Sequence, residues 1–458
     1  MNRVRILVVV GLYVVTLLWA YATVVSPAFA YDGLTLTWPG PVPMAWLVTL
    51  AVLPALLLPY ALSRPSAVVL WWLYLAAYIP SILVPALSLS MPFERLLPLQ
   101  VTLLVCMGFL CFSFSAKLLD VGQLALSADV FWPVFLLVWG ISLGYVCMTA
   151  QVGTLISNLA SLFHGATEYT IRHDYHDLVF NETGRGLAYA VGQLANALNP
   201  FLMVFGLVYH RRICLVGGII GQIIVFSLTG FKTPLLSGVV LALVALFMKR
   251  WRHSFGFALT SGLIAAILCC AIVDRISGNV FCSSLITRRT LLIPGQLTGF
   301  YFEHYSRVPP AGIGLHFAHD EALLTPPNEI GFTYFGDADA NANANLWAEG
   351  FAELGLPGIV GYTILVAVLI WIYDSISAKR DLTMAVLLAV MPAVMVSNTS
   401  PTTVLISHGG LAAALVLYLS PWPKPGEASE SEEEEIRIPH PPARWLESSS
   451  VFRWFTVR

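Results

Sequence analysis

The sequence predicts an all-α polytopic membrane protein, and three observations carry that prediction. The 458 residues are 57% hydrophobic and only 11% charged, whereas soluble domains carry roughly 25% charged residues. The mean hydropathy is +0.77. Long apolar runs recur along the chain, many of them close to the ~20 residues that a helix needs to span a bilayer. A membrane β-barrel would instead show segments of roughly ten residues with alternating hydropathy.

The apolar runs and the breaks between them predict about twelve membrane-spanning helices. They lie near residues 6–26, 43–62, 66–88, 97–116, 130–150, 186–209, 213–231, 233–248, 255–273, 354–373, 382–397 and 402–420. The seventh and eighth are the weakest pair. They meet at the tight turn "LTGFKTPLL", and an error of one helix here would reverse the orientation of the C-terminal half.

Basic residues in short loops predict the orientation, because such loops stay in the cytoplasm. With the N-terminus inside, these basic residues all fall inside: Arg64, Lys117, Arg211, Arg212, Lys249, Arg250, Arg252, Lys379 and Arg380. Two large loops, at about 151–185 and 274–353, then face outward. We expect a helical bundle with its loops over residues 1–420. Residues 421–458 form a cytoplasmic, acidic tail whose composition predicts disorder.

The N-terminal segment and the cysteines refine this reading. "SPAFA" (26–30) fits a signal-peptide cleavage site, but the apolar run is longer than a usual signal core, so we favour an uncleaved first helix. Six of the seven cysteines lie in apolar runs and are interpreted as small hydrophobic residues. Cys282 alone faces a loop, and the spacings indicate neither a zinc site nor a disulfide framework.

The second outer loop carries an arginine pair, Arg288 and Arg289, followed by the apolar and aromatic run "TLLIPGQLTGFYFEHYS". That run predicts a helix at the membrane interface. Guanidinium groups bind phosphate oxygens in a bidentate fork, so the pair suits a lipid-linked pyrophosphate. Lys232 could add a charge to the same site, or it could be a lysine that reaches the interface from a helix end.

A polar run, "GDADANANANLWAEGFAELG", occupies residues 336–355. Asn341, Asn345, Glu349 and Glu353 are four residues apart, so on a helix they would form one polar stripe. Alternatively, Asn341 or Asn345 caps a helix and Glu349 favours its N-terminal end. Amides and carboxylates around Trp347 suit a carbohydrate, because sugar hydroxyls both donate and accept hydrogen bonds.

Other polar residues give weaker signals. "RHDYHD" (172–177) mixes histidine and aspartate, and a polar outer loop is favoured over a metal site because the spacing is not diagnostic. Four amides lie inside predicted spans, where they face the bundle, line a water-filled path or join helices: Gln193, Asn196, Asn199 and Gln222.

Two motifs resemble the bacterial Wzy-type polymerases of O-antigen and related oligosaccharide repeat units. These are "RRTLLIPGQLTGFYFEHYS" and, further along, "DADANANANLWAEGFAELGLPGI". The family shows an arginine-led segment with a Tyr-x-x-[Tyr/Phe] run, then an asparagine-rich stretch that leads into a helix near "LG-x-x-G". The "TGFKT" turn is also similar. The match covers about a quarter of the chain, and it separates the protein better from transporters than from O-antigen ligases.

The resemblance implies a GT-C-like fold and an inner-membrane glycosyltransferase. Such enzymes move a growing glycan from undecaprenyl pyrophosphate to a sugar hydroxyl of another lipid-linked repeat unit, at the outer face of the membrane. The alternatives are an O-antigen ligase, with the same donor and another acceptor, and a flippase of lipid-linked oligosaccharide. A flippase would favour internal repeats, and the sequence shows none.

The resemblance also assigns roles to residues. Arg288 and Arg289, with Lys232 and Arg172, would bind the substrate. Tyr301 and Tyr305 would line its path, and a second set would hold sugars: Asn341, Asn343, Asn345 and Trp347. The candidates for the general base are Asp339, Glu349 and His304. No cofactor, no metal and no nucleic acid is expected. The partners are the lipid-linked donor and acceptor, the bilayer and, as a further candidate, a polysaccharide chain-length regulator.

Overall fold

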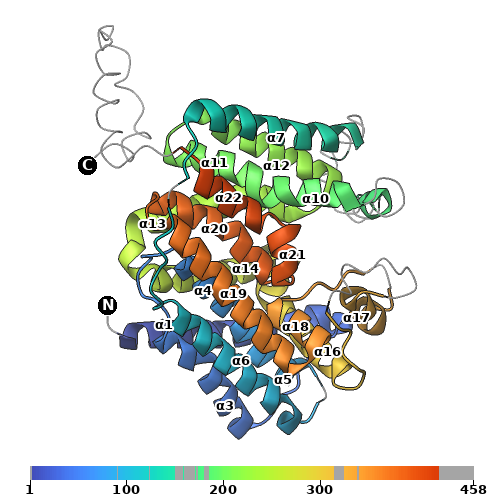
Figure 1. The fold of residues 1–458 in the computed structure, drawn as a ribbon. Helices are drawn as coiled ribbons and strands as arrows, with labels where there is room; N and C mark the ends of the chain where they lie inside the picture. Colours follow the sequence, from blue (N-terminus) through green and yellow to red (C-terminus); the bar gives the residue numbers. More distant parts are fainter. Residues whose placement is uncertain are drawn as a thin grey trace. The chain divides into compact units, whose positions relative to one another are not determined.

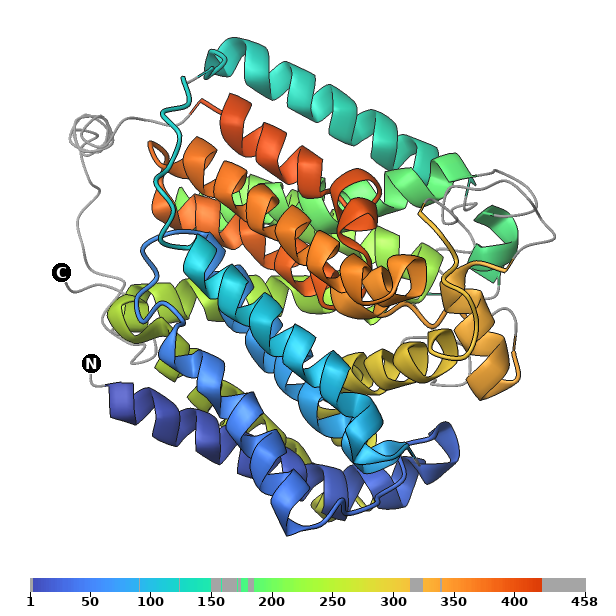
Figure 2. The same ribbon diagram turned by 60° about the horizontal axis from the view of Figure 1, so that its bottom comes forward.

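The computed structural model describes residues 3–89, 91–122, 124–149, 158, 171, 174–179, 185–313, 324–337 and 340–421. The described residues up to Ser420 form one compact, all-helical unit (Figures 1 and 2). The predicted tail lies outside the described residues from position 422 onward.

The N-terminal half contributes the blue to green elements in Figure 1. Its first segment is α1 (Arg3–Ala20), η1 (Tyr21–Val25), α2 (Ser26–Phe29) and η2 (Ala30–Asp32). Next come α3 (Pro41–Val52), η3 (Leu53–Leu56), α4 (Ser66–Leu73), η4 (Tyr74–Tyr78), α5 (Ile79–Ser88), α6 (Phe93–Ser113) and α7 (Ala128–Thr149). The sixth predicted span is α10 (Arg185–Gln193), η7 (Leu194–Leu198) and α11 (Asn199–Val208).

The C-terminal half runs from green to red. It begins with α12 (Arg212–Thr229), α13 (Lys232–Trp251), η8 (Arg252–Ser254) and α14 (Phe255–Ser277). The segment of the second outer loop holds α15 (Phe281–Ser283), η9 (Ser284–Leu292), α16 (Ile293–Tyr305), α17 (Pro326–Phe335) and α18 (Leu346–Leu354). The chain ends in α19 (Leu356–Ser377), α20 (Leu382–Val396), α21 (Pro401–Ile406) and α22 (Gly410–Leu419).

Eight stretches of the described residues are long and apolar enough to cross a membrane. One of them, Lys232–Ser277, holds both α13 and α14, and three shorter apolar helices accompany the eight: Pro41–Leu56, Leu382–Val396 and Gly410–Leu419. Each of the twelve predicted segments contains a helix, the weak pair α12 and α13 included. Gly230, with φ +64°, ends α12 and lets the chain turn into α13. The protein is thus an all-α, multi-pass membrane protein.

The loops predicted to lie inside contact one another at one end of the bundle. Arg64 donates to the carbonyls of Phe114 and Ala116, and Arg252 donates to the carbonyl of Leu62. At the same end, Lys379 pairs with Asp120, and Arg380 donates to the carbonyls of Tyr418 and Ser420. Predicted outer segments likewise meet each other, since Thr37 N donates to Leu87 O at 2.8 Å. The helices therefore alternate in direction as the basic residues predict.

The amides inside the spans join helices to one another. Trp139 Nε1 donates to Asn199 Oδ1 at 2.8 Å, which links α7 to α11. Gln222 Nε2 donates to Ala195 O at 2.8 Å and to Ser237 Oγ at 3.0 Å, which links α12 to η7 and α13. These bonds satisfy polar groups that the bilayer interior cannot solvate.

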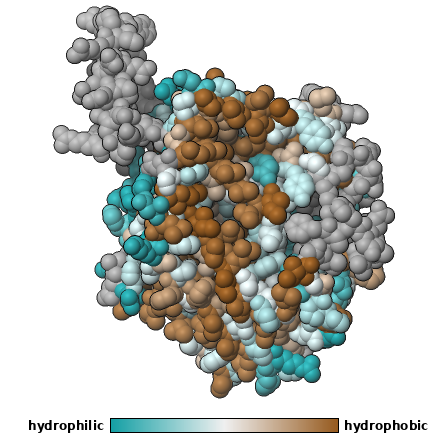
Figure 3. Space-filling model, viewed as in Figure 1, coloured by the Kyte–Doolittle hydropathy of each residue, from teal (hydrophilic) through white to brown (hydrophobic). Residues whose placement is uncertain are grey.

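A broad band of apolar side chains covers the face of the unit shown in Figure 3. Many large apolar side chains are exposed along the helices, among them Val105, Leu137, Ile220, Leu243, Val368 and Leu415. In a soluble protein such exposure would mark an interaction surface. Here the helix lengths and hydropathy make the hydrocarbon core of a bilayer the natural cover.

Candidate functional site

Helix α16 occupies the centre of the candidate site. Together with η9 it is one continuous helical segment, and it packs against α5, α17 and α18 (lower right of Figure 1). Every residue from Pro294 to Phe302 is buried. Gly295 permits the close approach to α5, because a Cβ there would lie 2.3 Å from Pro80 O. The predicted helix of the second outer loop therefore exists, and it is enclosed by other helices.

The backbone around the arginines is unusual. Arg288 and Arg289 lie in η9, a π-helix of nine residues, and π-helical turns are rare and frequently occur at functional sites. Two further π-helical segments, η1 and η4, contact η9. Three elements of this rare type thus converge where the sequence predicts a phosphate site.

Arg288 is held by the end of the first helical segment. Its guanidinium pairs with the Asp32 carboxylate and lies over the Phe29 ring, 4.3 Å from the ring centroid. Gln296 Nε2 donates to the backbone carbonyl of Asp32 at 2.6 Å. No sequence signal connects Asp32 to Arg288, because 256 positions separate them.

Three polar atoms around Arg288 lack a protein partner. Within the described part of the chain, Thr287 Oγ1, Arg288 Nε and Gln296 Oε1 are buried without a hydrogen bond. The side chains of Thr287 and Gln296 are 1% and 0% exposed. Buried polar groups are nearly always hydrogen-bonded. Arg288 and Gln296 both bond to Asp32, so their unpartnered atoms mark a place where water or a ligand can complete the site.

Lys232 lies beside the segment that leads to the arginines. Its Nζ is 5.1 Å from the ring centroid of Phe281, which begins α15 just ahead of η9. The structure therefore places the predicted third cation at the start of the arginine segment. Arg289 is half-buried in the same π-helix.

The start of η9 is fastened to the end of α14. Asp274, only 4% exposed, accepts hydrogen bonds from Cys282 N at 2.8 Å and Ser283 N at 2.7 Å. Cys270 and Cys282 form a disulfide. This corrects the expectation that Cys270 is only a small hydrophobic residue and that the chain has no disulfide. Helix α14 brings position 270 within reach of position 282, which cysteine spacing alone does not reveal.

The asparagine-rich run is extended rather than helical at its start. Asn341 and Asn343 are exposed, whereas Ala342 and Ala344 are buried, which is the alternation of an extended chain. Ala342 N donates to Pro327 O at 3.1 Å, so the segment lies along α17. Helix α18 begins only at Leu346. The predicted helical stripe from Asn341 to Glu353 is therefore wrong, and only Glu349 and Glu353 share the helix.

Asn345 is the N-cap of α18, as the alternative reading of the sequence held. Its Oδ1 accepts from Trp347 N at 3.0 Å and from Ala348 N at 3.3 Å. Its Nδ2 donates to Thr298 Oγ1 at 2.8 Å and to Pro294 O at 3.0 Å, both on α16. Asn345 is fully buried, so it joins the two predicted motifs directly.

Glu349 and Trp347 are also fully buried. Tyr301 donates to Ala342 O at 3.1 Å and lies 3.4 Å from Glu349 Oε1. Burial and, secondarily, the Glu349 carboxylate raise the pKa of Tyr301 well above its ordinary value, so the phenol keeps its proton as a donor. Trp347 Nε1 donates to Thr363 Oγ1 at 3.1 Å, which turns the indole into the bundle.

His304 belongs to a more accessible cluster. Its Nε2 lies 2.9 Å from Glu329 Oε1, and Tyr305 donates to Glu329 Oε2 at 2.7 Å. The side chains of His304 and Glu329 are 14% and 35% exposed. Burial, followed by Glu329, raises the pKa of Tyr305, which keeps its phenol a donor. The sequence gives no signal for Glu329 as a site residue. "TPPNE" marks a helix start, but nothing in it indicates a contact with His304.

The arginines lie in η9, at the start of the helical segment that η9 and α16 form. His304 lies near the end of that segment, and Glu349 lies beside the same end. Thirteen positions separate Arg288 from Tyr301, which corresponds to about 15–20 Å at a rise of about 1.5 Å per residue. Tyr301 contacts Glu349, and His304 lies further along. Arg172 and Asp339 lie outside the described residues.

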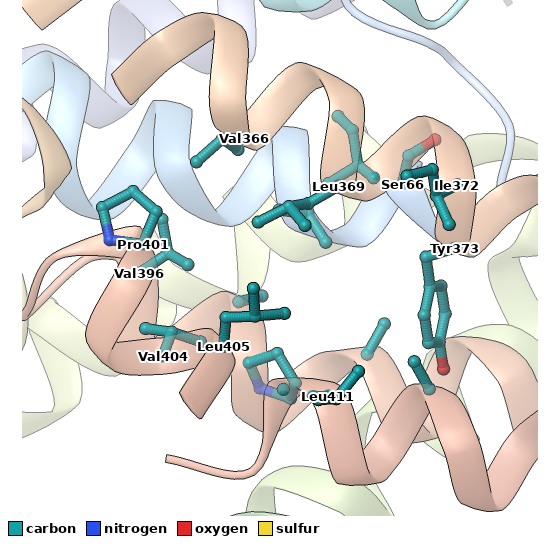
Figure 4. Close-up of a pocket in the computed structure, with 17 residues that line it drawn as sticks. Ser66, Val366, Leu369, Ile372, Tyr373, Val396, Pro401, Val404, Leu405 and Leu411 are labelled. Atoms are coloured by element: carbon teal, nitrogen blue, oxygen red, sulfur yellow. The ribbon is translucent and has the colours of Figure 1, made fainter. Parts of the chain in front are cut away.

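The apolar cavity in Figure 4 lies away from these residues. It has a volume of about 300 Å³ and is enclosed mainly by α19, α20, α21 and α22, with Val366, Leu369, Pro401 and Leu411 among its lining residues. Its two hydroxyl-bearing residues already have partners: Ser66 Oγ donates to Asp374 and Tyr373 OH donates to Ala385 O. The cavity offers nothing to a phosphate or a sugar.

Comparisons with known proteins add no relative. No protein-family model matches the chain, and neither a curated protein nor a solved structure matches it. The functional assignment therefore depends on the residues and contacts around α16.

Proposed function

We propose that the protein is a Wzy-type polymerase of the bacterial inner membrane. It transfers a growing glycan from undecaprenyl pyrophosphate to a sugar hydroxyl of another lipid-linked repeat unit, at the outer face. The fold would be GT-C-like, with twelve spans, two outer loops and both termini in the cytoplasm.

One observation carries the proposal: the two motifs behind the resemblance are hydrogen-bonded to each other. Asn345, from the asparagine-rich run, bonds to Pro294 and Thr298 of the arginine-led segment. Tyr301 in turn reaches Ala342 and the vicinity of Glu349. If the two motifs resembled the family by composition alone, direct hydrogen bonds between them would not be expected.

The disulfide supports an outer position for this cluster. Disulfides persist in oxidising compartments and are rare in the cytosol. Cys282 lies at the end of α14 that the basic residues predict to be outside, opposite the end with Lys249 and Arg250. The charge pattern and the disulfide therefore favour the same side of the membrane.

The residues divide into a phosphate end and a glycan end along α16. At the phosphate end, Arg288 and Arg289 bind the pyrophosphate and stabilise its growing charge as it departs. At the glycan end, the exposed Asn341 and Asn343 and the His304 cluster hold sugars of the repeat unit. Asn345, Tyr301 and Trp347 maintain the shape of this end from within.

The polymerase makes a direct prediction for purified protein in nanodiscs with lipid-linked repeat units alone. Wild type yields a ladder of products on a gel. Arg288→Ala and Arg289→Ala lower the yield about 100-fold or more, the usual effect of removing a group that stabilises transition-state charge. Arg275→Ala is the matched control, because Arg275 is an exposed arginine in the last turn of α14, and it keeps the ladder.

Other results would point elsewhere. A folded wild type that makes no ladder but moves lipid-linked sugar across a vesicle membrane would establish the flippase. Transfer of a single glycan to a different acceptor, without a ladder, would establish the ligase. Equal losses in Arg288→Ala and Arg275→Ala would contradict a specific phosphate site.

A further inference from the structure

We propose that Asp32 is a catalytic residue of this enzyme, an inference that rests on the proposed function. Asp32 pairs with Arg288 in the structure. The donor pyrophosphate takes over Arg288, and the released Asp32 carboxylate accepts the proton of the attacking sugar hydroxyl.

The position of Asp32 is built into the fold. Asp32 ends the short 3₁₀ turn η2, and Gly33 follows it with φ +82°. A Cβ at Gly33 would lie 2.8 Å from the Phe300 ring on α16. Gln296 binds the Asp32 carbonyl from the same helix. The backbone is thus fixed against α16, while the carboxylate stays 22% exposed and the Arg288 side chain 15% exposed.

The unpartnered atoms around this pair match the groups of the two substrates. Arg288 Nε and the Thr287 hydroxyl are donors, which suit phosphate oxygens. Gln296 Oε1 is an acceptor, and its amide adjoins Asp32. It suits a sugar hydroxyl. Arg288 and Gln296 both contact Asp32, so a donor for the leaving group and an acceptor for the nucleophile lie beside the same aspartate.

Charge explains why the exchange matters for catalysis. In the ion pair, the Arg288 guanidinium occupies an oxygen of the Asp32 carboxylate. When the pyrophosphate binds Arg288, Asp32 loses that partner, and its oxygens become free to accept a proton from a second donor. Binding the donor therefore creates the base next to the bond that must break.

The step balances as a single displacement. The acceptor oxygen forms a bond to the anomeric carbon of the donor sugar, and its proton passes to Asp32. The bond between that carbon and the pyrophosphate oxygen breaks, and its electron pair stays on the lipid pyrophosphate held by the arginines. Glu349 and His304 are less suitable bases, because they adjoin the far end of α16.

Asp32→Asn separates this role from a merely structural one. Without the competing carboxylate, inorganic pyrophosphate should bind the purified protein about two- to fivefold more tightly, since an ion pair of this exposure contributes up to about 1 kcal/mol. Turnover in the ladder assay should fall about 100-fold or more through loss of the base. Asp129→Asn, at an exposed position on α7, should change neither, and Asp32→Glu should recover part of the turnover.

The outcomes are distinct. Weaker pyrophosphate binding in a folded Asp32→Asn protein, or unchanged turnover, would overturn the inference. If Asp32→Asn does not fold, Asp32→Glu becomes the test. Its turnover in the ladder assay must then exceed that of a reaction without protein. A wild type that makes no ladder overturns the proposed function and the proton transfer. Tighter pyrophosphate binding by Asp32→Asn would in that case still support the exchange at Arg288.

Discussion

At the scale of single residues, the three asparagines of the polar run have two different tasks. Asn345 is buried and bonded on both sides of its amide, whereas Asn341 and Asn343 are exposed. Identical side chains at alternate positions thus serve packing in one case and remain open to solvent in the other two.

Substituting these asparagines should separate stability from binding. Asn345→Ala removes a helix cap and a buried link to α16, so we expect a loss of about 1–3 kcal/mol in unfolding free energy. Asn343→Ala should leave stability unchanged and reduce only glycan transfer. Thermal unfolding in detergent, measured beside the ladder assay, checks both. A stable Asn345→Ala protein would show that the cap is dispensable.

Sequence reasoning at this scale proposed candidate residues but not the partners that the structure gives them. Arg288 was predicted from its charge and aromatic neighbours. Asp32 could not be singled out, because an aspartate after the first span resembles any other loop residue. Only the fold brings it into contact with Arg288, which lies 256 positions later in the sequence. Glu349 is a candidate general base by its carboxylate alone. The sequence gives no sign that this carboxylate is fully buried and lies against Tyr301.

At the scale of elements, the spans were predictable and the helices between them were not. In a bilayer each backbone polar group must be satisfied within its own segment, so apolar length predicts a helix. Helices α17 and α18 are only ten and nine residues long. They depend on contacts with α16 and α19, and the π-helical turns have no sequence signature at all.

The junction of α18 and α19 offers a test of such contacts. A Cβ on Gly358 would lie 1.8 Å from Gly350 O, whereas a Cβ on Gly361, one turn later, meets nothing within 4 Å. Gly358→Ala should therefore destabilise the protein by about 1–3 kcal/mol through overpacking. Gly361→Ala is the control and should be neutral. Equal melting temperatures for both variants would mean that the two helices pack less closely than described.

At the scale of the whole molecule, the basic residues at one end of the bundle predict its orientation and also bond neighbouring loops to one another. Arg64, Arg252 and Arg380 donate to backbone carbonyls of neighbouring loops. The same charges that predict a cytoplasmic position for these loops thus satisfy carbonyl groups at the helix ends. The orientation predicted from charge and the contacts of the structure are consistent throughout the described bundle.

Labelling of intact cells should distinguish the two faces. Asn343→Cys places a thiol in the exposed part of the polar run, and Ser115→Cys places one in an exposed loop at the basic end. A membrane-impermeant maleimide should modify only the first. Wild type controls for its five free cysteines. Modification of the second variant alone would invert the orientation and remove the argument for an outer active site.

The bond between Cys270 and Cys282 has a further consequence for maturation. The bond that fastens α15, at the start of η9, to α14 forms only where thiols are oxidised. If the proposed function holds, a newly inserted chain is therefore incomplete until this segment reaches an oxidising compartment. The phosphate end would then reach its final structure only after the segment that carries Cys282 has crossed the membrane. A cell that loses envelope oxidation should retain the helical bundle yet hold its arginines less firmly.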